Sequence, residues 1–351
     1  MTALSWVAVA VFLFAYGLIA SEKVHRVAAA LGGAGIMLLI HATDAGAAFF
    51  SEETGIDWNV IFLLLGMMVI VGVLKQTGVF EFLAIWAAKR ARGRPYRLMV
   101  LLVVITASAS ALLDNVTTVL LIAPVTFLVC ERLALPAAPY LIAEAMASNI
   151  GGTATLVGDP PNIIIASRGG LGFNDFLAHM APMVIVLMVV FVGLCRLLFR
   201  KHFRYDPERA AEVMALNERE AIADRRLLWQ SMAVLALVMA AFVLHPVLHY
   251  EPSVVAVLGA GVLVAATRVT TEEAIGEVEW PTLVFFAGLF VMVGALVHTG
   301  VIGQVSRLAA DATQGQLGLT TMLLLWASGG LSAIVDNIPY VATMSPIVAD
   351  L

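Results

Sequence analysis

Long apolar runs constrain this chain more than any other feature of its sequence. An α-helix needs ~17–25 apolar residues to cross the ~30 Å hydrocarbon core of a bilayer. Six runs approach or reach that length: residues 4–20, 58–74, 98–113, 182–199, 227–244 and 281–297. Hydrophobic residues make up 61% of the 351 residues and charged residues only 13%, whereas soluble domains have roughly 45–50% and about 25%. The sequence therefore predicts an all-α polytopic membrane protein.

Cysteine and histidine usage argues against metal or redox chemistry. The two cysteines, Cys130 and Cys195, lie far apart inside apolar runs, and the seven histidines lack ligand spacing such as H-E-x-x-H. We therefore expect no cofactor, no disulfide framework and no thiolate metal site. Nothing in the sequence points to nucleic acid as a partner.

Basic residues indicate how the chain is oriented in the membrane. They gather in two polar stretches, the first with Lys89, Arg90, Arg92, Arg94 and Arg97, the second with Arg196, Arg200, Lys201, Arg204, Arg209, Arg219, Arg225 and Arg226. By the positive-inside rule both stretches face the cytoplasm, which puts the N-terminus outside. We expect a multi-pass protein of the cell inner membrane, with loop 200–226 in the cytoplasm and 203–226 forming a linker helix.

The two halves of the chain are related by a repeat. A constant shift of 222 residues superposes Trp58 on Trp280, Ser110-Ala111 on Ser332-Ala333, Asp114-Asn115 on Asp336-Asn337, and Pro124 on Pro346. Chance agreement in one register is implausible for residues as uncommon as Trp, Asp-Asn and Pro, so the sequence contains an internal repeat. We expect residues 1–202 to form the first transmembrane repeat and 227–351 the second.

Topology predicts that these repeats are inverted. Counting the membrane spans along the chain, we expect Asp114-Asn115 to enter the membrane from the cytoplasmic side and Asp336-Asn337 from the opposite side. Inverted repeats are the architecture of many secondary transporters, whose substrate site lies at the repeat interface near the midplane. The same shift would place the partner of Asn149 beyond Leu351. We therefore expect a truncated second repeat that lacks its second broken helix.

Polar residues interrupt the apolar stretch that ends at Pro124. A carboxylate at membrane depth costs ~2.5–3.5 kcal/mol, so it should face a cavity or a partner. The alternative is a helix cap, with Asn115 capping a helix that runs to Cys130. A re-entrant hairpin with its tip at 114–115 fits both interpretations. The candidate ligands here are Asp114, Asn115, Thr117 and Thr118, with Asp336 and Asn337 in the second repeat.

A second polar stretch, near 149–162, predicts a broken helix. Gly151-Gly152 followed by Gly158-Asp159-Pro160-Pro161 cannot continue as one helix, because Pro lacks a donor and Gly is permissive. Non-helical backbone at membrane depth is tolerated only where it is buried in protein or lines a cavity. Its freed carbonyls and side-chain oxygens would suit a hard cation such as Na⁺, although an ordinary surface loop stays open as the alternative. The candidate ligands are Ser148, Asn149, Gly151, Gly152, Thr153, Gly158, Asp159, Pro160 and Asn162.

Four carboxyl groups are candidate proton carriers, because a low-dielectric environment favours the neutral form of a carboxyl. They are Asp114, Asp336, Glu144 and Asp159. For Glu144 the alternative of a position near a helix end stays open.

At these two motifs the chain resembles the ArsB/NhaD ion transporter superfamily. That superfamily joins arsenite exporters, sodium/proton antiporters, and citrate and divalent-anion/sodium symporters. The Leu-Asp114-Asn-Val-Thr-Thr hairpin and the run from Asn149 to Asn162 are most similar to the P-protein-like branch. The resemblance covers essentially the whole chain. It implies a first ion site at Asn115, Thr117, Asn149 and Gly152, with Na⁺ held by Asn115, Asn149 and Gly152. Asp114 stands where the symporter branch has Ser, which favours a titrating group.

These observations predict secondary active transport of a small anion or oxyanion, driven by Na⁺ or H⁺. The resemblance implies arsenite or carboxylates as substrates, and Na⁺/H⁺ antiport is the alternative. An intramembrane protease is disfavoured, because no Gly-x-Gly-Asp or His-Glu pair occurs. A non-transporting membrane subunit that partners a soluble ATPase stays open, since the chain has no Walker motif. Beside the lipid bilayer and the anionic substrate, a homodimer partner also stays open.

Overall fold

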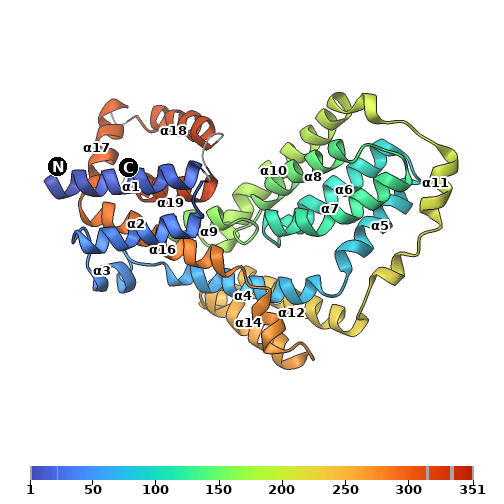
Figure 1. The fold of residues 1–351 in the computed structure, drawn as a ribbon, viewed down its shortest axis with the longest axis horizontal. Coiled ribbons are helices and arrows are strands. Elements are labelled where there is room, and N and C mark those ends of the chain that lie inside the picture. The colour runs from blue at the N-terminus through green and yellow to red at the C-terminus, as the bar shows by residue number, and fades with distance from the viewer. Residues whose placement is uncertain (1, 22, 314–315, 333–335, 350–351) are drawn as a thin grey trace. The chain divides into compact units, whose positions relative to one another are not determined.

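Every regular element in the described part of the chain is a helix (Figure 1). The computed structural model describes residues 2–21, 23–313, 316–332 and 336–349. Six of the described helices are long and apolar enough to cross a membrane: α1 (Ala3–Ser21), α4 (Trp58–Lys75), α7 (Asn115–Arg132), α10 (Phe173–Leu198), α12 (Arg225–Val243) and α16 (Trp280–His298). The prediction of an all-α polytopic membrane protein is confirmed.

The remaining helices are shorter. In chain order they are α2 (Arg26–Leu39), α3 (Ala45–Phe50), α5 (Val79–Ala91), α6 (Pro95–Ser110), α8 (Ala137–Gly152), α9 (Pro160–Gly169), α11 (Pro207–Met214), α13 (His245–Leu248), α14 (Pro252–Ala266), α15 (Thr271–Gly276), α17 (Val301–Ala312), α18 (Leu317–Ser332) and α19 (Asn337–Ala349), with 3₁₀ turns η1 (Arg200–His202) and η2 (Glu218–Ala221).

Helix boundaries recur at the spacing found in the sequence. The four helices α4 to α7 begin at residues 58, 79, 95 and 115, and α16 to α19 begin at 280, 301, 317 and 337, which is the same shift of 222. Helices α2 and α3 recur as α14 and α15 at a shift of 226. Ala333, the sequence counterpart of Ala111, lies outside the described residues. The inverted orientation of the repeats stays a prediction.

Two compact units divide the chain, and each takes helices from both halves. One unit holds Met1–Phe62, Ile164–Leu171 and Glu279–Leu351, and the other holds Leu63–Ile163 and Gly172–Val278. In the first unit α2 packs along α16, with α1 beside them (Figure 1). The predicted division at 202 and 227 follows chain order instead, and it stays a prediction.

Close glycine contacts inside the two units are related by the shifts of the repeat. In the first unit, a Cβ on Gly288 would lie 3.0 Å from the backbone of Ala30. In the second unit, a Cβ on Gly66 would lie 2.6 Å from the backbone of Ala256. Gly66 corresponds to Gly288 and Ala30 to Ala256, so the α4-type helix of each repeat packs against the α2-type helix of the other. Glycine is needed at both crossings because the backbones approach so closely.

The stretch 203–226 is not the single linker helix that the sequence predicted. Helix α11 ends at Met214, and the next turn, η2, begins four residues later. Asn217 interrupts the helix, because its side-chain oxygen accepts a hydrogen bond from the backbone N–H of Arg219 at 3.3 Å. Such local side-chain bonds compete with helical bonding. The linker therefore consists of the short helix α11 followed by the 3₁₀ turn η2.

Helices α5 to α8 pack together in the second unit (Figure 1). Their shared core contains Leu98, Leu102, Val129 and Tyr140, all nearly inaccessible to solvent. The Tyr140 hydroxyl donates to the Pro95 carbonyl at 3.2 Å, which satisfies its polar end in the core. Both cysteines are buried and free, in agreement with a packing role. This helix group carries the candidate site.

Candidate functional site

The turn between α6 and α7 forms a hairpin tip whose cap is Asp114. Asp114 has an extended backbone, and its Oδ1 accepts from the backbone N–H of Thr117 at 2.8 Å. The Thr118 hydroxyl donates to the Asp114 carbonyl at 2.9 Å. Asp114, and not Asn115 as the capping alternative had it, is therefore the cap of this helix. Because Asn115 already has its backbone in the helix, its side chain is available for contacts with other segments.

The predicted break in the second polar stretch is present. Helix α8 ends at Gly152 and α9 begins at Pro160. The Asn162 side-chain amide donates to the carbonyls of Gly152 and Thr155, each at 2.9 Å. These bonds satisfy carbonyls that the break removes from the helix, and burial makes that satisfaction necessary. The break is thus an ordered bend rather than a loose surface loop.

The hairpin tip meets this bend in one polar cluster. The Asn115 side-chain amide donates to Asn149 Oδ1 at 2.8 Å and reaches Asp159 Oδ2 at 3.4 Å. In return, the Ser148 hydroxyl donates to the Asn115 carbonyl at 2.8 Å. Asp159 and Ser148 are buried, while Asn149 is exposed at the edge. Two segments more than thirty residues apart therefore build the cluster.

Two further hydroxyls join the tip to the bend, and neither was among the predicted site residues. Ser110 Oγ donates to the Ser148 carbonyl at 2.8 Å and lies 3.1 Å from Ser148 Oγ. The Thr155 hydroxyl donates to the Ala111 carbonyl and accepts from the Gly158 N–H at 3.1 Å. Ser110 could have been found, because it recurs as Ser332 in the repeat. Thr155 carries no comparable signal.

Glycines let the backbones of this cluster approach one another. A Cβ on Gly151 would lie 2.2 Å from the Ala107 carbonyl oxygen. A Cβ on Gly158 would lie 2.5 Å from the Gly152 carbonyl oxygen and 2.7 Å from that of Ser110. Any side chain there would displace the backbone. The close approach concentrates carbonyl oxygens around Gly158, and oxygen is the ligand atom that hard cations prefer.

Glu144 lies in the middle of α8 and not near a helix end, which removes that alternative. Its side chain is 1% exposed, and Oε1 accepts from the Thr126 hydroxyl at 2.6 Å. Oε2 has no hydrogen-bond partner among the described residues. Glu144 and Ser148 are four residues apart on one helix face, about 6 Å along the axis. Thr126 was not predicted, because nothing in the sequence links it to Glu144.

Other predicted residues lie at the margin of the cluster or away from it. The Thr153 hydroxyl donates to the Ile150 carbonyl at 2.7 Å and so finishes its own helix, and Pro160 opens α9. Asp336 and Asn337 belong to the other compact unit. Asp336 Oδ1 accepts from the Ile338 N–H at 3.3 Å, and Ser332 donates to Asn337 Oδ1. The functional roles of all these residues stay predictions.

Comparison with known proteins gives one family and several relatives. A family model described as citrate transporter matches residues 16–351. A 46 kDa membrane protein of Mycobacterium leprae is 58% identical over 348 residues, which is 99% of this chain and 81% of the relative. A protein of Mycobacterium tuberculosis with the name uncharacterized transporter is 57% identical with the same coverage. The P protein of Homo sapiens is 31% identical over 98% of this chain, which spans 50% of that relative.

Proposed function

The chain belongs to the citrate transporter family, and from that premise we propose that it couples movement of a small anion to a flux of Na⁺ or H⁺. It is a membrane transporter and not an enzyme. The substrate class we propose is a small carboxylate or oxyanion. The observation that carries the proposal is the side chain of Asn115, held between Asn149 and Asp159 where the hairpin tip meets the broken helix.

A coupling cation would bind at this junction. The Asn115 amide nitrogen is engaged with Asn149 and Asp159, so its amide oxygen is the atom that would face an ion. The carboxylate of Asp159 and the crowded carbonyl oxygens beside Gly158 add charge and further oxygen ligands, as Na⁺ requires. The carboxylate also offsets part of the ion's desolvation cost.

A small anion would bind beside the cation, at the helix ends. Helix α7 starts at Asn115 and α9 at Pro160, so two helix N-termini lie at the cluster. Helix N-termini present unsatisfied N–H groups and a partial positive charge, which favour carboxylates and oxyanions. Binding the cation would strengthen anion binding at the same place, and that mutual dependence is what coupled transport needs.

Glu144 supports proton coupling, and with it Na⁺/H⁺ exchange as the second candidate function. A buried ionised carboxyl with one oxygen unpartnered is costly, so the neutral form suits this position. Losing and regaining that proton would change the charge of α8 one turn from Ser148. We propose Asp114, Asp159 and Asp336 as the other proton carriers.

The test is transport in proteoliposomes that hold the purified protein, with imposed Na⁺ or H⁺ gradients and a panel of citrate, succinate, arsenite and Na⁺. We expect gradient-driven movement of a carboxylate or oxyanion without ATP. Asn115→Ala should reduce the rate at least about tenfold by removing a ligand and its two contacts. Asn174→Ala loses one side-chain hydrogen bond, to the Val243 carbonyl, away from the cluster; it is the matched control and should transport normally. If no gradient moves any substrate, the proposal fails. The alternative of a non-transporting subunit that partners a soluble ATPase would then be tested next.

Asp114→Asn separates proton coupling from folding. Asn caps helices as well as Asp does, so the hairpin should fold normally. We expect substrate-linked pH changes inside the vesicles to disappear in this variant, and Glu144→Gln to show whether the second carboxyl shares the task. Unaltered pH changes in Asp114→Asn would remove Asp114 from the list of proton carriers.

A further inference from the structure

A basic pocket opens at the end of α5, away from the hairpin tip. Its volume is about 270 Å³, and it is lined by Trp86, Lys89, Arg90, Arg92, Met214 and Glu218. The first four residues come from α5 and its C-terminal cap, and the other two from the linker. All six belong to one compact unit. Nothing in the transport proposal uses this pocket.

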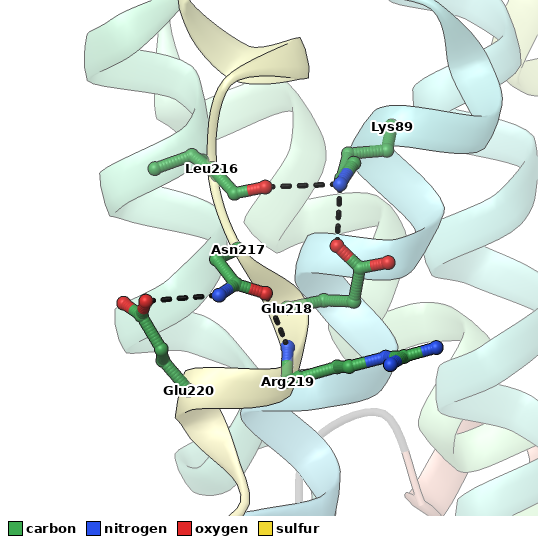
Figure 2. A network of polar contacts seen from close by, with 6 residues as sticks. All are labelled: Lys89, Leu216, Asn217, Glu218, Arg219 and Glu220. Carbon is green, nitrogen blue, oxygen red and sulfur yellow. Dashed lines mark hydrogen bonds and ion pairs between the residues drawn. The ribbon is translucent and has the colours of Figure 1, made fainter.

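One of the three cations is already neutralised within the protein. Lys89 Nζ forms an ion pair with Glu218 and donates to the Leu216 carbonyl at 3.0 Å (Figure 2). Arg90 and Arg92 are exposed, and within the described part of the chain neither makes an ion pair or a side-chain hydrogen bond. The lining therefore has a net charge of about +2 that two guanidinium groups carry. Among the described residues of the lining, Glu218 is the only acidic one and is already paired with Lys89, so the charge of the two arginines is not balanced within the pocket.

The pocket is built by fixed backbone contacts rather than by chance proximity of loops. Arg92 has φ 54° and ends α5, with its N–H bonded to the Lys89 carbonyl at 3.0 Å. A Cβ on Gly93 would lie 2.4 Å from Ala210 Cβ, so the chain after α5 presses on α11. At the other end of α5, the Ala223 N–H donates to the Thr77 carbonyl at 3.1 Å. The linker is thus fastened at both ends of α5.

Apolar side chains stand beside the two guanidinium groups. Trp86 is 40% exposed and Met214 is 45% exposed. Tryptophan is enriched at the membrane–water interface, where one end of the ring is apolar and the other wet. A ligand that contacts the whole lining therefore needs an anionic group that binds the arginines and an apolar part that packs against Trp86 and Met214.

We propose that this pocket binds the phosphate group of an anionic phospholipid. Guanidinium groups bind phosphate oxygens in bidentate fashion, and clusters of basic residues next to a membrane span attract anionic lipid headgroups. Free phosphate shares the anionic chemistry, but it would leave the Trp86 and Met214 walls unused. The proposal depends on membrane insertion and not on the transported substrate. Because Met214 and Glu218 lie on the linker, a bound lipid would also tie the linker to α5.

The test compares two variants that lose the same charge. Arg90→Gln with Arg92→Asn removes the pocket arginines, and Asn tolerates the left-handed backbone at position 92. Arg200→Gln with Arg204→Gln removes two exposed arginines of loop 200–226 that do not line the pocket. Both variants and the parent protein are titrated in detergent with phosphatidylglycerol, phosphatidylcholine, glycerol phosphate and inorganic phosphate, and adducts are counted by native mass spectrometry.

We expect the Kd for phosphatidylglycerol to rise about 30-fold in the pocket variant, since each basic residue near a lipid surface changes the Kd about fivefold. The control variant should change by less than about threefold. Equal weakening in both variants would show diffuse surface charge and overturn the site. Binding of glycerol phosphate or inorganic phosphate as tight as that of phosphatidylglycerol would overturn the lipid assignment.

Arg90→Gln alone guards against misfolding of the double variant, because it leaves the strained position 92 untouched. It should raise the Kd about fivefold with an unchanged unfolding temperature. Arg92→Lys keeps the charge but loses the bidentate fork, so its Kd should lie between those of parent and double variant. A Kd for Arg90→Gln equal to that of the parent would contradict the proposal.

Discussion

The hairpin tips of the two repeats have the same Asp-Asn sequence but different surroundings. At the first tip, Asn115 bonds to Asn149 and Asp159, residues of a distant segment. At the second tip, the hydrogen bonds of Asp336 and Asn337 among the described residues stay within the hairpin, to Ile338 and Ser332. Both tips start a helix. Local sequence therefore suffices for the cap, whereas the polar cluster at the first tip needs a second segment folded against it.

Glycine positions show the same contrast. Gly151 of α8 packs against the first hairpin, and a Cβ added to it would lie 2.2 Å from the Ala107 carbonyl oxygen. Gly329 takes the place of Ala107 in the second hairpin, and a Cβ there would meet nothing within 4 Å. The first hairpin is therefore expected to be intolerant of added volume, and the second tolerant. Four experiments would break or sharpen this comparison.

The largest effect is expected from added volume at the crossing of α6 and α8. Gly151→Val should destabilise the protein by about 3 kcal/mol, because a side chain there overlaps backbone that cannot move independently. Gly329→Ala, at the position in the second hairpin that corresponds to Ala107, should alter stability by at most about 1 kcal/mol and in the stabilising direction. Thermal unfolding in detergent measures both. Similar losses in the two variants would end the distinction.

Removing the amide at each tip should give a smaller difference of the same sign. Asn115→Ala removes one hydrogen-bond donor from the Asn149 oxygen and one from the buried Asp159, at a cost of about 1–3 kcal/mol. Asn337→Ala loses one contact within the hairpin and should cost about 0.5–1 kcal/mol. Chemical denaturation of each variant, measured beside the parent, would detect the gap. Equal costs would mean that the long-range contacts add nothing to stability.

The caps are where the two tips should behave alike. Asp114→Ala should cost about 1 kcal/mol, because the N–H of Thr117 loses its acceptor. Asp336→Ala should cost no more than that, since its bond to the Ile338 N–H is longer. Asp114→Asn and Asp336→Asn should keep both caps intact, because Asn caps helices about as well as Asp. A loss well above this value at one tip only would show that its aspartate does more than cap.

The smallest effect concerns acid pH at the base of the first hairpin. The hydrogen bond from Lys89 lowers the pKa of Glu218 below its ordinary value of 4.5. The ion pair therefore stabilises the fold above pH 4.5, and this contribution is lost as the pH falls through the lowered pKa. Protection factors for amide hydrogen exchange at residues 216–221, which correct for the slower intrinsic exchange in acid, should fall below pH 4.5 in the parent protein.

Lys89→Met supplies the control for that measurement. Without the lysine the pKa of Glu218 should return towards 4.5, so the protection factors at 216–221 should already be low at neutral pH and should change little on acidification. The repeat places Asp311 at the position of Lys89, so no comparable acid effect is expected at the base of the second hairpin. Protection factors at 216–221 that do not change with pH in the parent protein would contradict the role of the pair.

Sequence patterns predicted the membrane class, the repeat spacing and the helix break, because each depends on local chemistry. Apolar length is visible in the chain itself, and Gly-Asp-Pro-Pro stops a helix in any context. The cap was assigned one residue too late, since Asp and Asn are nearly equivalent caps and backbone angles decide between them. The prediction of a single linker helix was wrong because the side chain of Asn217 competes with helical hydrogen bonding. The composition of the segment does not reveal that competition.

By itself the sequence determined that this protein crosses a membrane, that its two halves are related, and which polar residues interrupt its apolar spans. Tertiary structure alone decided that Asn115 meets Asn149 and Asp159, that Thr126 bonds to the buried Glu144, and that the linker completes a basic pocket with α5. The physical reason is the distance along the chain over which each interaction acts. Helix length, breaks and caps depend on neighbours within a turn, whereas a site depends on which distant surfaces pack closely enough to share hydrogen bonds.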